Sequence, residues 1–296
     1  MKEKIRQLVK EKNAIILAHN YEPPQIQDIA DLCGDSLELS IKASKTDADI
    51  IIFCGVHFMA ETAKILSPEK TVILPNIDAG CPMADMVTPE TLLKRKKELN
   101  NIPVVTYVNS SASVKAISDV CCTSANVIEI VNKIDSNEIL MTPDRNLAQY
   151  AAAHTSKKIH LWEGFCPFHN AITREEALKA KKDHPSAILI AHPECPQEVL
   201  SVADQIGSTS GMINFAKGSD KKEFLIATEV GHLYPLKKAA PDKIFHIVSK
   251  NAYCKDMKKI TLEDILKSLE TGHGEIDVPK EIRIKALASV KKMLEF

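Results

Sequence analysis

Short apolar runs alternate with amphipathic stretches along the whole chain. The run from Ala14 to Ala18 is apolar throughout and then changes abruptly to the polar residues 19–21, a pattern typical of a buried parallel strand. Before it, Ile5, Leu8 and Val9 recur at helical spacing among charged residues, which predicts an amphipathic helix. Strands that alternate with helices predict right-handed βαβ units, and therefore parallel sheets covered by helices on both faces.

The same pattern occurs three times. The apolar-to-polar change at His19 recurs at Tyr107 and His192, which lie 88 and 85 residues further along (107 − 19 and 192 − 107). Because these three positions keep a nearly constant spacing, they indicate three copies of a unit of 85 to 88 residues, which has the size of a small domain. The same offsets also relate Asp31 to Asp119 and Asp204, and Ser36 to Ser124 and Thr209.

The repeat predicts an α/β protein of three similar small domains, each a parallel-sheet αβα unit, arranged with pseudo-threefold symmetry around a central active site. The expected boundaries are 1–83 for the first repeat with its N-terminal helix, 84–168 for the second, and 169–296 for the third with the C-terminal helices. Ligands bind beyond the carboxyl ends of strands in open parallel sheets. The polar segments 19–21, 107–109 and 192–194 should therefore meet at the axis.

Three predicted helix starts share one place in the repeat. Residues 34–36 open a helix, a second begins near Ser124, and a third follows residues 207–209. A helix N-terminus presents free amide donors and about half a positive charge, so these ends should hold the anionic groups of a ligand. Alternatively, the hydroxyls at Ser36, Ser124 and Thr209 are only helix caps, each contributing about 1 kcal/mol to stability.

The charge balance excludes several kinds of partner. The chain has 38 basic and 39 acidic residues and no long run of either sign, so it lacks the footprint expected for nucleic acid or a membrane surface. No apolar stretch approaches the roughly 20 residues that span a bilayer, and the N-terminus lacks the apolar core of a signal peptide. We expect a cytoplasmic protein that acts on small molecules and binds neither nucleic acid nor membrane.

Three of the eight cysteines follow the repeat. Cys81, Cys166 and Cys254 lie 85 and 88 residues apart (166 − 81 and 254 − 166). In a reducing compartment, cysteines in a chain of this length are more consistent with metal ligands or buried thiols than with disulfides. Three cysteines from three units can meet at the axis and hold one metal centre. We interpret the other five as buried thiols: Cys33, Cys54, Cys121, Cys122 and Cys195.

Two kinds of metal centre fit these three cysteines. Zinc usually takes four ligands, and His169, three residues after Cys166, could complete a Cys₃His site. Iron–sulfur clusters usually take four thiolates, so three would leave one iron free to act as a Lewis acid. Three unrelated buried cysteines are the remaining alternative. The spacing favours a cluster, because it lacks the close Cys-x-x-Cys pairs common in zinc sites.

Proton donors and acceptors gather at the predicted strand ends. His19 and His192 occupy equivalent positions, and Tyr21, Tyr107 and Glu194 lie close to them in the repeat. This set is suited to stepwise dehydration and tautomerisation, although Tyr107 could also be a packing residue. We assign structural or surface roles to His57, His154, His160, His184, His232, His246 and His273.

These motifs resemble those of the quinolinate synthase family over nearly the whole chain. The resemblance implies a [4Fe–4S] cluster on Cys81, Cys166 and Cys254. It also implies condensation of iminoaspartate with dihydroxyacetone phosphate to quinolinate, with release of phosphate and water, on the route to NAD. The matching motifs are Ala18 to Tyr21, Gly34 to Ser36, Met59 to Glu61, Gly80 to Met83, Tyr107 to Asn109, Cys122 to Asn126, Pro143 to Leu147, His192 to Pro196 and Gly207 to Thr209.

The resemblance also implies roles for individual residues, with Tyr21 and Glu194 as the expected proton-transfer groups. The catalytic set is Tyr21, His19, Glu194, His192 and Tyr107. The expected substrate contacts are His19, Ser36, Tyr107, Val108, Asn109, Ser124, His192, Pro193, Glu194 and Thr209.

A functional link to an enzyme that produces iminoaspartate is implied as well. Other readings are a different three-cysteine cluster enzyme, such as a diphthamide-synthesis-like enzyme that cleaves S-adenosylmethionine, and a non-enzymatic iron–sulfur or zinc protein. A scaffold would need none of the proton-transfer groups at the strand ends, which speaks against the last reading. Turnover with dihydroxyacetone phosphate separates the two enzymes.

Overall fold

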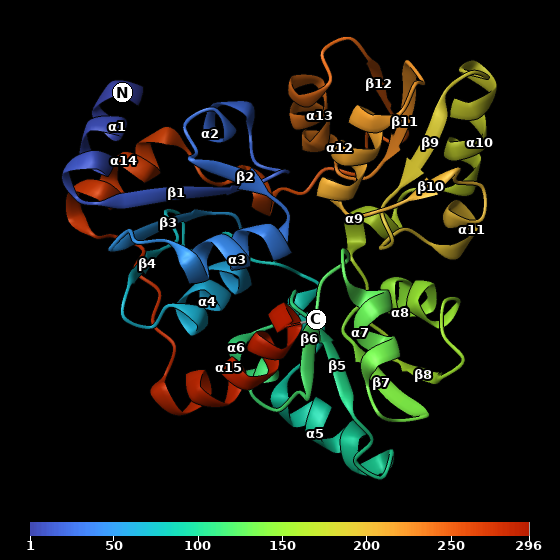
Figure 1. The fold of residues 1–296 in the computed structure, drawn as a ribbon, viewed down its shortest axis with the longest axis horizontal. Helices are drawn as coiled ribbons and strands as arrows, with labels where there is room; N and C mark the ends of the chain where they lie inside the picture. The colour runs from blue at the N-terminus through green and yellow to red at the C-terminus, as the bar shows by residue number, and fades with distance from the viewer. Residues whose placement is uncertain (296) are drawn as a thin grey trace.

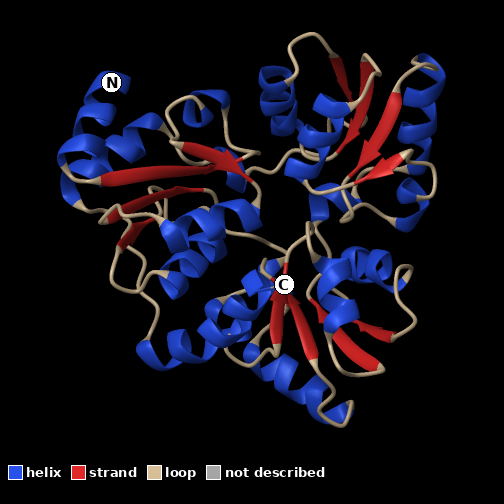
Figure 2. Ribbon diagram, viewed as in Figure 1, coloured by secondary structure: helices blue, strands red, loops and turns tan. Residues whose placement is uncertain are grey.

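The structure, a computed structural model, describes residues 1–295 and contains three four-stranded sheets arranged around the middle of the molecule (Figures 1 and 2). The strand orders are β2-β1-β3-β4, β6-β5-β7-β8 and β10-β9-β11-β12, so each sheet repeats one topology. Every strand pair is parallel. The predicted fold of three similar parallel α/β units is confirmed.

Apolar runs form the central strands, because both faces of these sheets are covered by helices. The sequence analysis missed the short outer strands β2, β6 and β10, whose two or three residues are too few to form a pattern of their own. The strands are β1 (Ala14–His19), β2 (Leu32–Gly34), β3 (Ile50–Cys54), β4 (Thr71–Ile73), β5 (Val104–Tyr107), β6 (Val120–Cys122), β7 (Glu138–Thr142), β8 (Lys158–Leu161), β9 (Ile188–Ala191), β10 (Gln205–Ile206), β11 (Glu223–Ala227) and β12 (Ile244–Ile247).

Helices connect the strands and cover the sheets. None of those in residues 1–295 combines the length and the apolar character needed to cross a membrane. The helices are α1 (Lys2–Glu11), α2 (Pro24–Gln27), α3 (Ser36–Lys45), α4 (His57–Leu66), η1 (Ala84–Met86), α5 (Pro89–Glu98), α6 (Ala112–Lys115), α7 (Val127–Lys133), α8 (Arg145–Ala152), α9 (Pro167–Asn170), α10 (Arg174–Asp183), α11 (Gln197–Leu200), α12 (Thr209–Gly218), η2 (Val230–His232), α13 (Leu233–Ala239), η3 (Asp256–Lys258), α14 (Leu262–Thr271) and α15 (Lys280–Glu295).

The repeated aspartates are structural. Asp31, Asp119 and Asp204 each accept a main-chain N–H bond at 2.8 Å from the central strand of their sheet. Each also pairs with a basic residue of the preceding helix, at 2.7 Å from Arg6, 3.2 Å from Lys96 and 2.8 Å from Lys181. The carboxylate thus fixes the outer strand and the helix to the sheet in all three units, which explains its constant place in the repeat.

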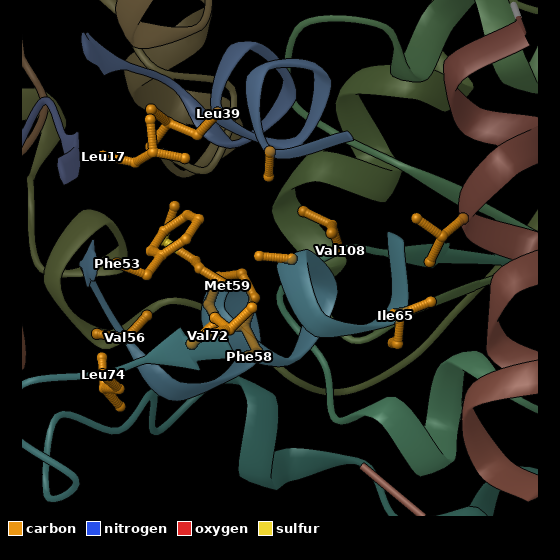
Figure 3. Packing of buried hydrophobic residues seen from close by; sticks show 14 of the residues in the cluster. Leu17, Leu39, Phe53, Val56, Phe58, Met59, Ile65, Val72, Leu74 and Val108 are labelled. Atoms are coloured by element: carbon orange, nitrogen blue, oxygen red, sulfur yellow. The ribbon is translucent and has the colours of Figure 1, made fainter. Parts of the chain in front are cut away.

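The apolar core is shared unequally among the units. Buried residues of the first and second units form one continuous cluster, in which Val108 from the second unit lies near Phe58 and Met59 of the first (Figure 3). The third unit has separate clusters on the two faces of its sheet, as Phe224 and Leu225 illustrate, because successive strand residues point to opposite faces.

The segment after the third unit returns to the first two. Figure 1 shows α14 beside α1 and α15 beside α6. Between these helices the chain passes along β4, where Gly274 has φ +89° and an added Cβ would lie 2.2 Å from the Leu74 carbonyl oxygen, so only glycine fits. The predicted domain boundaries stay a prediction. The C-terminal helices that we assigned to the third repeat pack on the first and second units.

Candidate active site

One pocket, with an empty volume of about 700 Å³, is lined by residues at the carboxyl ends of strands from all three sheets. His19 ends β1, Tyr107 ends β5, and His192 directly follows β9. This is where open parallel sheets bind ligands. The predicted residues that line the pocket are His19, Tyr21, Ser36, Cys81, Tyr107, Asn109, Ser124, Cys166, His192, Glu194, Thr209 and Cys254.

Two predicted substrate contacts, Val108 and Pro193, do not line this pocket. Val108 is 1% exposed and lies in the shared core (Figure 3). Its main-chain N–H is already used, because it donates to the Cys122 carbonyl at 2.8 Å. Contact of either residue with a ligand therefore stays a prediction.

His19 and His192 are held in the same way in two different units. Nδ1 of His19 accepts the main-chain N–H of Tyr21 at 3.2 Å, and Nδ1 of His192 accepts that of Glu194 at 3.3 Å. A neutral imidazole that accepts at Nδ1 carries its proton on Nε2. Burial is the largest of the effects that lower the pKa of each ring to about 3. Both histidines are therefore neutral Nε2–H donors near pH 7.

Lowering the pH from 7 to 5.5 should destabilise the protein through its buried histidines. Burial, followed by electrostatic interaction with the nearby His19 and His192 rings, also lowers the pKa of His232 to about 3. Between the ordinary pKa of about 6.5 and about 3, the unfolded chain binds protons that the folded chain does not. The free energy of unfolding therefore falls with falling pH, by about 1.4 kcal/mol per pH unit for each such histidine.

The variant His232→Met should lose less stability than the unmodified protein when anaerobic urea unfolding at pH 7 and pH 5.5 is compared, because one of three contributions is gone. His273 is exposed, so His273→Gln should keep the full pH dependence. An unchanged pH dependence in His232→Met would contradict the assignment of His232 as a buried neutral ring.

A chain of hydrogen bonds, which we call the relay, crosses the pocket and joins the two tyrosines. Tyr107 OH donates to Glu194 Oε1 at 2.6 Å, and Glu194 Oε2 lies 2.7 Å from Nδ1 of His169. Nε2 of His169 lies 2.8 Å from Thr228 Oγ1, which lies 2.6 Å from Tyr21 OH. The relay links groups from all three units, so a proton can pass between opposite sides of the pocket.

The pKa values of the tyrosines at the two ends of the relay are raised, whereas the pKa of Glu194 within it is lowered. Burial alone would raise the pKa of Glu194, but the His169 ring, His192 and the Tyr107 hydroxyl together hold that pKa below its ordinary value. Burial, with the nearby Glu194 carboxylate next in size, raises the pKa values of Tyr21 and Tyr107 well above 10. The relay therefore holds an ionised carboxylate between protonated tyrosines, which supplies both a base and an acid.

The sequence analysis missed part of the relay. His169 was considered only as a zinc ligand, and Thr228 was not considered. Thr228 directly follows β11, so the strand-end rule that identified His19 would have found it if the rule had been applied to the third strand of each sheet. The role of His169 had no sequence signal beyond its place three residues after Cys166.

Acidic residues after β7 and β11 hold two of the cysteine loops. Asp144 Oδ2 accepts the Cys166 N–H at 3.2 Å, and Glu229 Oε1 accepts the Cys254 N–H at 3.1 Å. Glu229 also pairs with Lys258 at 3.0 Å, and the Lys258 ammonium donates to the Tyr21 carbonyl. Because Lys258 lies just beyond Cys254, this pair fixes that loop against the first unit.

Each of the three predicted metal ligands lies one to three residues before a short helical turn: Cys81 before η1, Cys166 before α9 and Cys254 before η3. Burial raises the pKa of the Cys81 thiol to about 12 and that of Cys254 to about 11, and it raises the pKa of Cys166 well above 9. Main-chain N–H groups of the turn that follows each cysteine lower the thiol pKa at all three sulfurs. Such donors stabilise thiolates that carry a metal centre.

The spacing of the donor atoms distinguishes between metal centres. Within residues 1–295, two sets of three donors have ligand atoms within 4.8 Å of one another: Cys166 with His169 and Glu194, and His184 with Glu223 and His246. The three cysteines are not such a set. One zinc ion at about 2.3 Å from each sulfur needs sulfurs no more than about 4.6 Å apart, so the three sulfurs, as the structure places them, do not have the spacing of a single zinc site.

The helix caps are residues next to the repeated hydroxyl side chains. Asp35 caps α3 and Ser208 caps α12, whereas Ser36 and Thr209 are the first residues of these helices. The interpretation of Ser36 and Thr209 as caps is therefore wrong. The helix expected near Ser124 begins later, at Val127, so Ser124 is not a cap either. All three hydroxyl residues line the pocket.

The pocket lining suits an anionic ligand without a basic cluster. No lysine or arginine is among the described residues that line it. Asn109 Oδ1 lines it as well and is buried without a hydrogen-bond partner in residues 1–295. A buried polar atom of this kind calls for a partner. Since the oxygen and nitrogen of an amide are interchangeable by a flip, Asn109 can offer a ligand either a donor or an acceptor.

A family model described as quinolinate synthetase A protein matches residues 3–295. The chain is 51% identical over 294 residues to a quinolinate synthase of Geobacter sp. (strain M21), covering 99% of this chain and 97% of that protein. It is 52% identical over 292 residues to quinolinate synthase 1 of Methanosarcina acetivorans, covering 99% and 96%. It is 53% identical over 293 residues to a quinolinate synthase of Thermodesulfovibrio yellowstonii, covering 99% and 97%. The similarity therefore extends over all three units.

Proposed function

The chain belongs to the quinolinate synthetase A protein family and is an enzyme of the quinolinate synthase kind, and we propose that the axial pocket carries out its reaction with a [4Fe–4S] cluster held by Cys81, Cys166 and Cys254. This proposal rests on the observation that the three thiols and side chains of the relay line the same pocket. The equivalent places of the three thiols in the repeat and the N–H groups beside each sulfur support a cluster. When bound, the cluster supplies an iron without a protein thiolate, which acts as a Lewis acid.

The proposed reaction joins iminoaspartate and dihydroxyacetone phosphate. Counting atoms, the two substrates give quinolinate, one phosphate and two waters, with no net oxidation or reduction. Ring closure therefore requires repeated proton removal from carbon and proton delivery to leaving oxygen atoms. We also infer a functional link to an enzyme that produces iminoaspartate.

The relay supplies these proton transfers. Glu194 is ionised because its pKa is lowered, so it accepts a proton from the substrate. Tyr21 is protonated because its pKa is raised, so it donates one. His169 and Thr228 lie between them, in links of 2.6 to 2.8 Å, and carry the proton back from Glu194 to Tyr21. The relay then returns to its starting state and can serve the next step.

Neutral donors hold the carboxylates and the phosphate. His19 and His192 each offer an Nε2–H group from opposite units. Ser36 and Thr209 add hydroxyls at the N-terminal ends of α3 and α12, where free amide groups and the helix dipole favour anions. Together with Asn109, Ser124 and Tyr107, they form the proposed substrate site. Neutral donors can hold the anionic groups of the substrate without placing a lysine or arginine among the residues that line the pocket.

Anaerobic turnover tests the proposal directly. Purified protein that contains iron and sulfide should form quinolinate from iminoaspartate and dihydroxyacetone phosphate and release one phosphate per quinolinate. Cleavage of S-adenosylmethionine instead of quinolinate formation would indicate the diphthamide-synthesis-like reaction. Zinc in place of iron would indicate the alternative favoured by the close set of Cys166, His169 and Glu194.

Thr209→Ala and Ser124→Ala should each raise the KM for iminoaspartate, or weaken a dicarboxylate inhibitor, about tenfold. Each variant loses one hydrogen bond to a charged group, which is worth about 1.5 to 3 kcal/mol. Steady-state kinetics measures this change, and kcat should change less than KM because the relay remains intact.

Thr261→Ala is the matched control, because Thr261 caps α14 and does not line the pocket. It should lower the free energy of unfolding by about 1 kcal/mol and leave KM unchanged. If Thr209→Ala and Ser124→Ala behave like Thr261→Ala, the anion site lies elsewhere.

A further inference from the structure

A second group of metal-binding side chains lies away from the pocket, in the third unit. His184, Glu223 and His246 each offer one ligand atom, and the three atoms lie within 4.8 Å of one another. His184 is the C-terminal cap residue of α10, Glu223 begins β11, and His246 lies in β12. Glu223 lies at the amino end of β11, whereas the pocket lies beyond the carboxyl ends of the strands, and none of the three residues lines it.

Both imidazole rings point at one carboxylate oxygen. Nδ1 of His184 lies 2.8 Å and Nε2 of His246 lies 2.9 Å from Glu223 Oε1. The two rings stack with their centroids 3.8 Å apart and their planes 28° apart. Ser186 Oγ donates to the other carboxylate oxygen at 3.1 Å. A hydrogen bond of this kind orients a carboxylate that binds a metal.

The register of the strands in the third sheet brings these side chains together. Leu225 pairs with His246 in the parallel ladder, and Glu223 lies two residues before Leu225, so Glu223 and His246 share one face of the sheet. Leu225 packs in a cluster with Ala180 of α10. Helix α10 therefore covers this face, and its end brings His184 to the same place. The three side chains are positioned by secondary structure rather than by mobile surface loops.

We propose that His184, Glu223 and His246 bind one divalent transition-metal ion, with Zn²⁺ as the expected ion, and that this ion ties α10 to the edge of the third sheet. Two imidazoles and a carboxylate are a set that such ions use, with solvent in the remaining position. Ligand atoms around tetrahedral zinc lie about 3.3 Å apart, so each histidine nitrogen needs to move only a few tenths of an ångström away from Glu223 Oε1. Their side chains are 25 to 33% exposed, which leaves room for a water ligand.

The second unit carries two of the three groups and provides an internal control. Glu138 and His160 occupy the places of Glu223 and His246 in the repeat, and their side chains meet at 2.7 Å. The residue that corresponds to His184 is Leu99, the C-terminal cap residue of α5. Lys158 also lies 3.1 Å from Glu138. A hydrophobic residue and a cation thus replace the third ligand, so the second unit should bind no metal.

Zinc titration of the cluster-loaded enzyme, under anaerobic conditions and in competition with a chromophoric chelator, tests the proposal. The enzyme should bind one Zn²⁺ per chain. His184→Ala and His246→Ala should each weaken binding about 100-fold, because even residues outside the ligand set change affinity by about 10- to 100-fold. His160→Ala should leave it unchanged. Zinc-edge X-ray absorption should show only nitrogen and oxygen neighbours at about 2.0 to 2.1 Å.

Each result of the zinc titration either supports or contradicts the proposal. Equal zinc affinity in His184→Ala and the unmodified enzyme would overturn the proposal, as would sulfur neighbours at about 2.3 Å, which would mean that zinc had taken the cysteines of the pocket. Failure of the enzyme to bind Zn²⁺ would mean that the group is held by hydrogen bonds alone. His246→Gln, a polar replacement, serves if either alanine variant does not fold. Unchanged iron content and quinolinate formation confirm that the variants keep the axial site.

Discussion

Cys81→Ser, Cys166→Ser and Cys254→Ser should each abolish the brown chromophore and lower activity by at least about a thousandfold. A serine oxygen does not replace a thiolate in a cluster that already has one thiolate fewer than usual. Loss of the Lewis acid removes several kcal/mol of transition-state stabilisation, and about 4 kcal/mol corresponds to roughly a thousandfold in rate. Iron and sulfide analysis, the visible spectrum and quinolinate formation measure the effect.

Cys33→Ser is the matched control, because Cys33 lies outside the pocket and its thiol donates to the Gln27 carbonyl at 3.4 Å. A serine hydroxyl can make the same bond. Iron content and activity should therefore be retained, and Cys54→Ala should also retain both. Equal loss in all five variants would mean that the cysteines act through stability and not as cluster ligands.

Glu194→Gln should lower kcat by about 10² to 10⁴, the range expected when a general base is removed. The glutamine side chain has the same shape but cannot accept a proton from the substrate. Its NH₂ group would also face Tyr107 or His169, which now lie 2.6 and 2.7 Å from carboxylate oxygens. The relay would be broken in its middle, while the three cysteines and the chromophore stay in place. The loss should therefore appear in kcat at unchanged iron content.

Glu22→Gln provides a comparison with another buried carboxyl group. Glu22 is fully buried, lies outside the pocket lining and has no hydrogen-bond partner for its carboxyl oxygens in residues 1–295. Burial raises its pKa well above the ordinary value, which favours the neutral acid, so a neutral amide of the same shape should be tolerated. Similar loss of kcat in both variants would show that burial, and not base catalysis, explains the effect at Glu194.

The sequence alone was sufficient for the threefold architecture and the cysteine set. Apolar runs and helical spacing are local patterns, and an internal repeat multiplies them, so the ends of β1, β5 and β9 could be aligned without coordinates. Parallel topology then requires these ends to meet, because all strands of a parallel sheet end at the same edge. The same reasoning placed Cys81, Cys166 and Cys254 in equivalent loops.

Only the tertiary structure decided what each residue does within that frame. Asp31 and Ser36 both follow the repeat, yet one fixes a strand and the other lines the pocket. The difference depends on which main-chain groups lie nearby after folding.

The relay and the group at Glu223 join residues that are 23 to 207 positions apart. No local pattern encodes such pairs, because they depend on strand register and on packing between units. The same reason explains why the short strands β2, β6 and β10 were missed and why the C-terminal helices pack on units that precede them in the chain. Periodicity determined where the polar ends of the strands lie, and long-range packing determined which of their side chains touch.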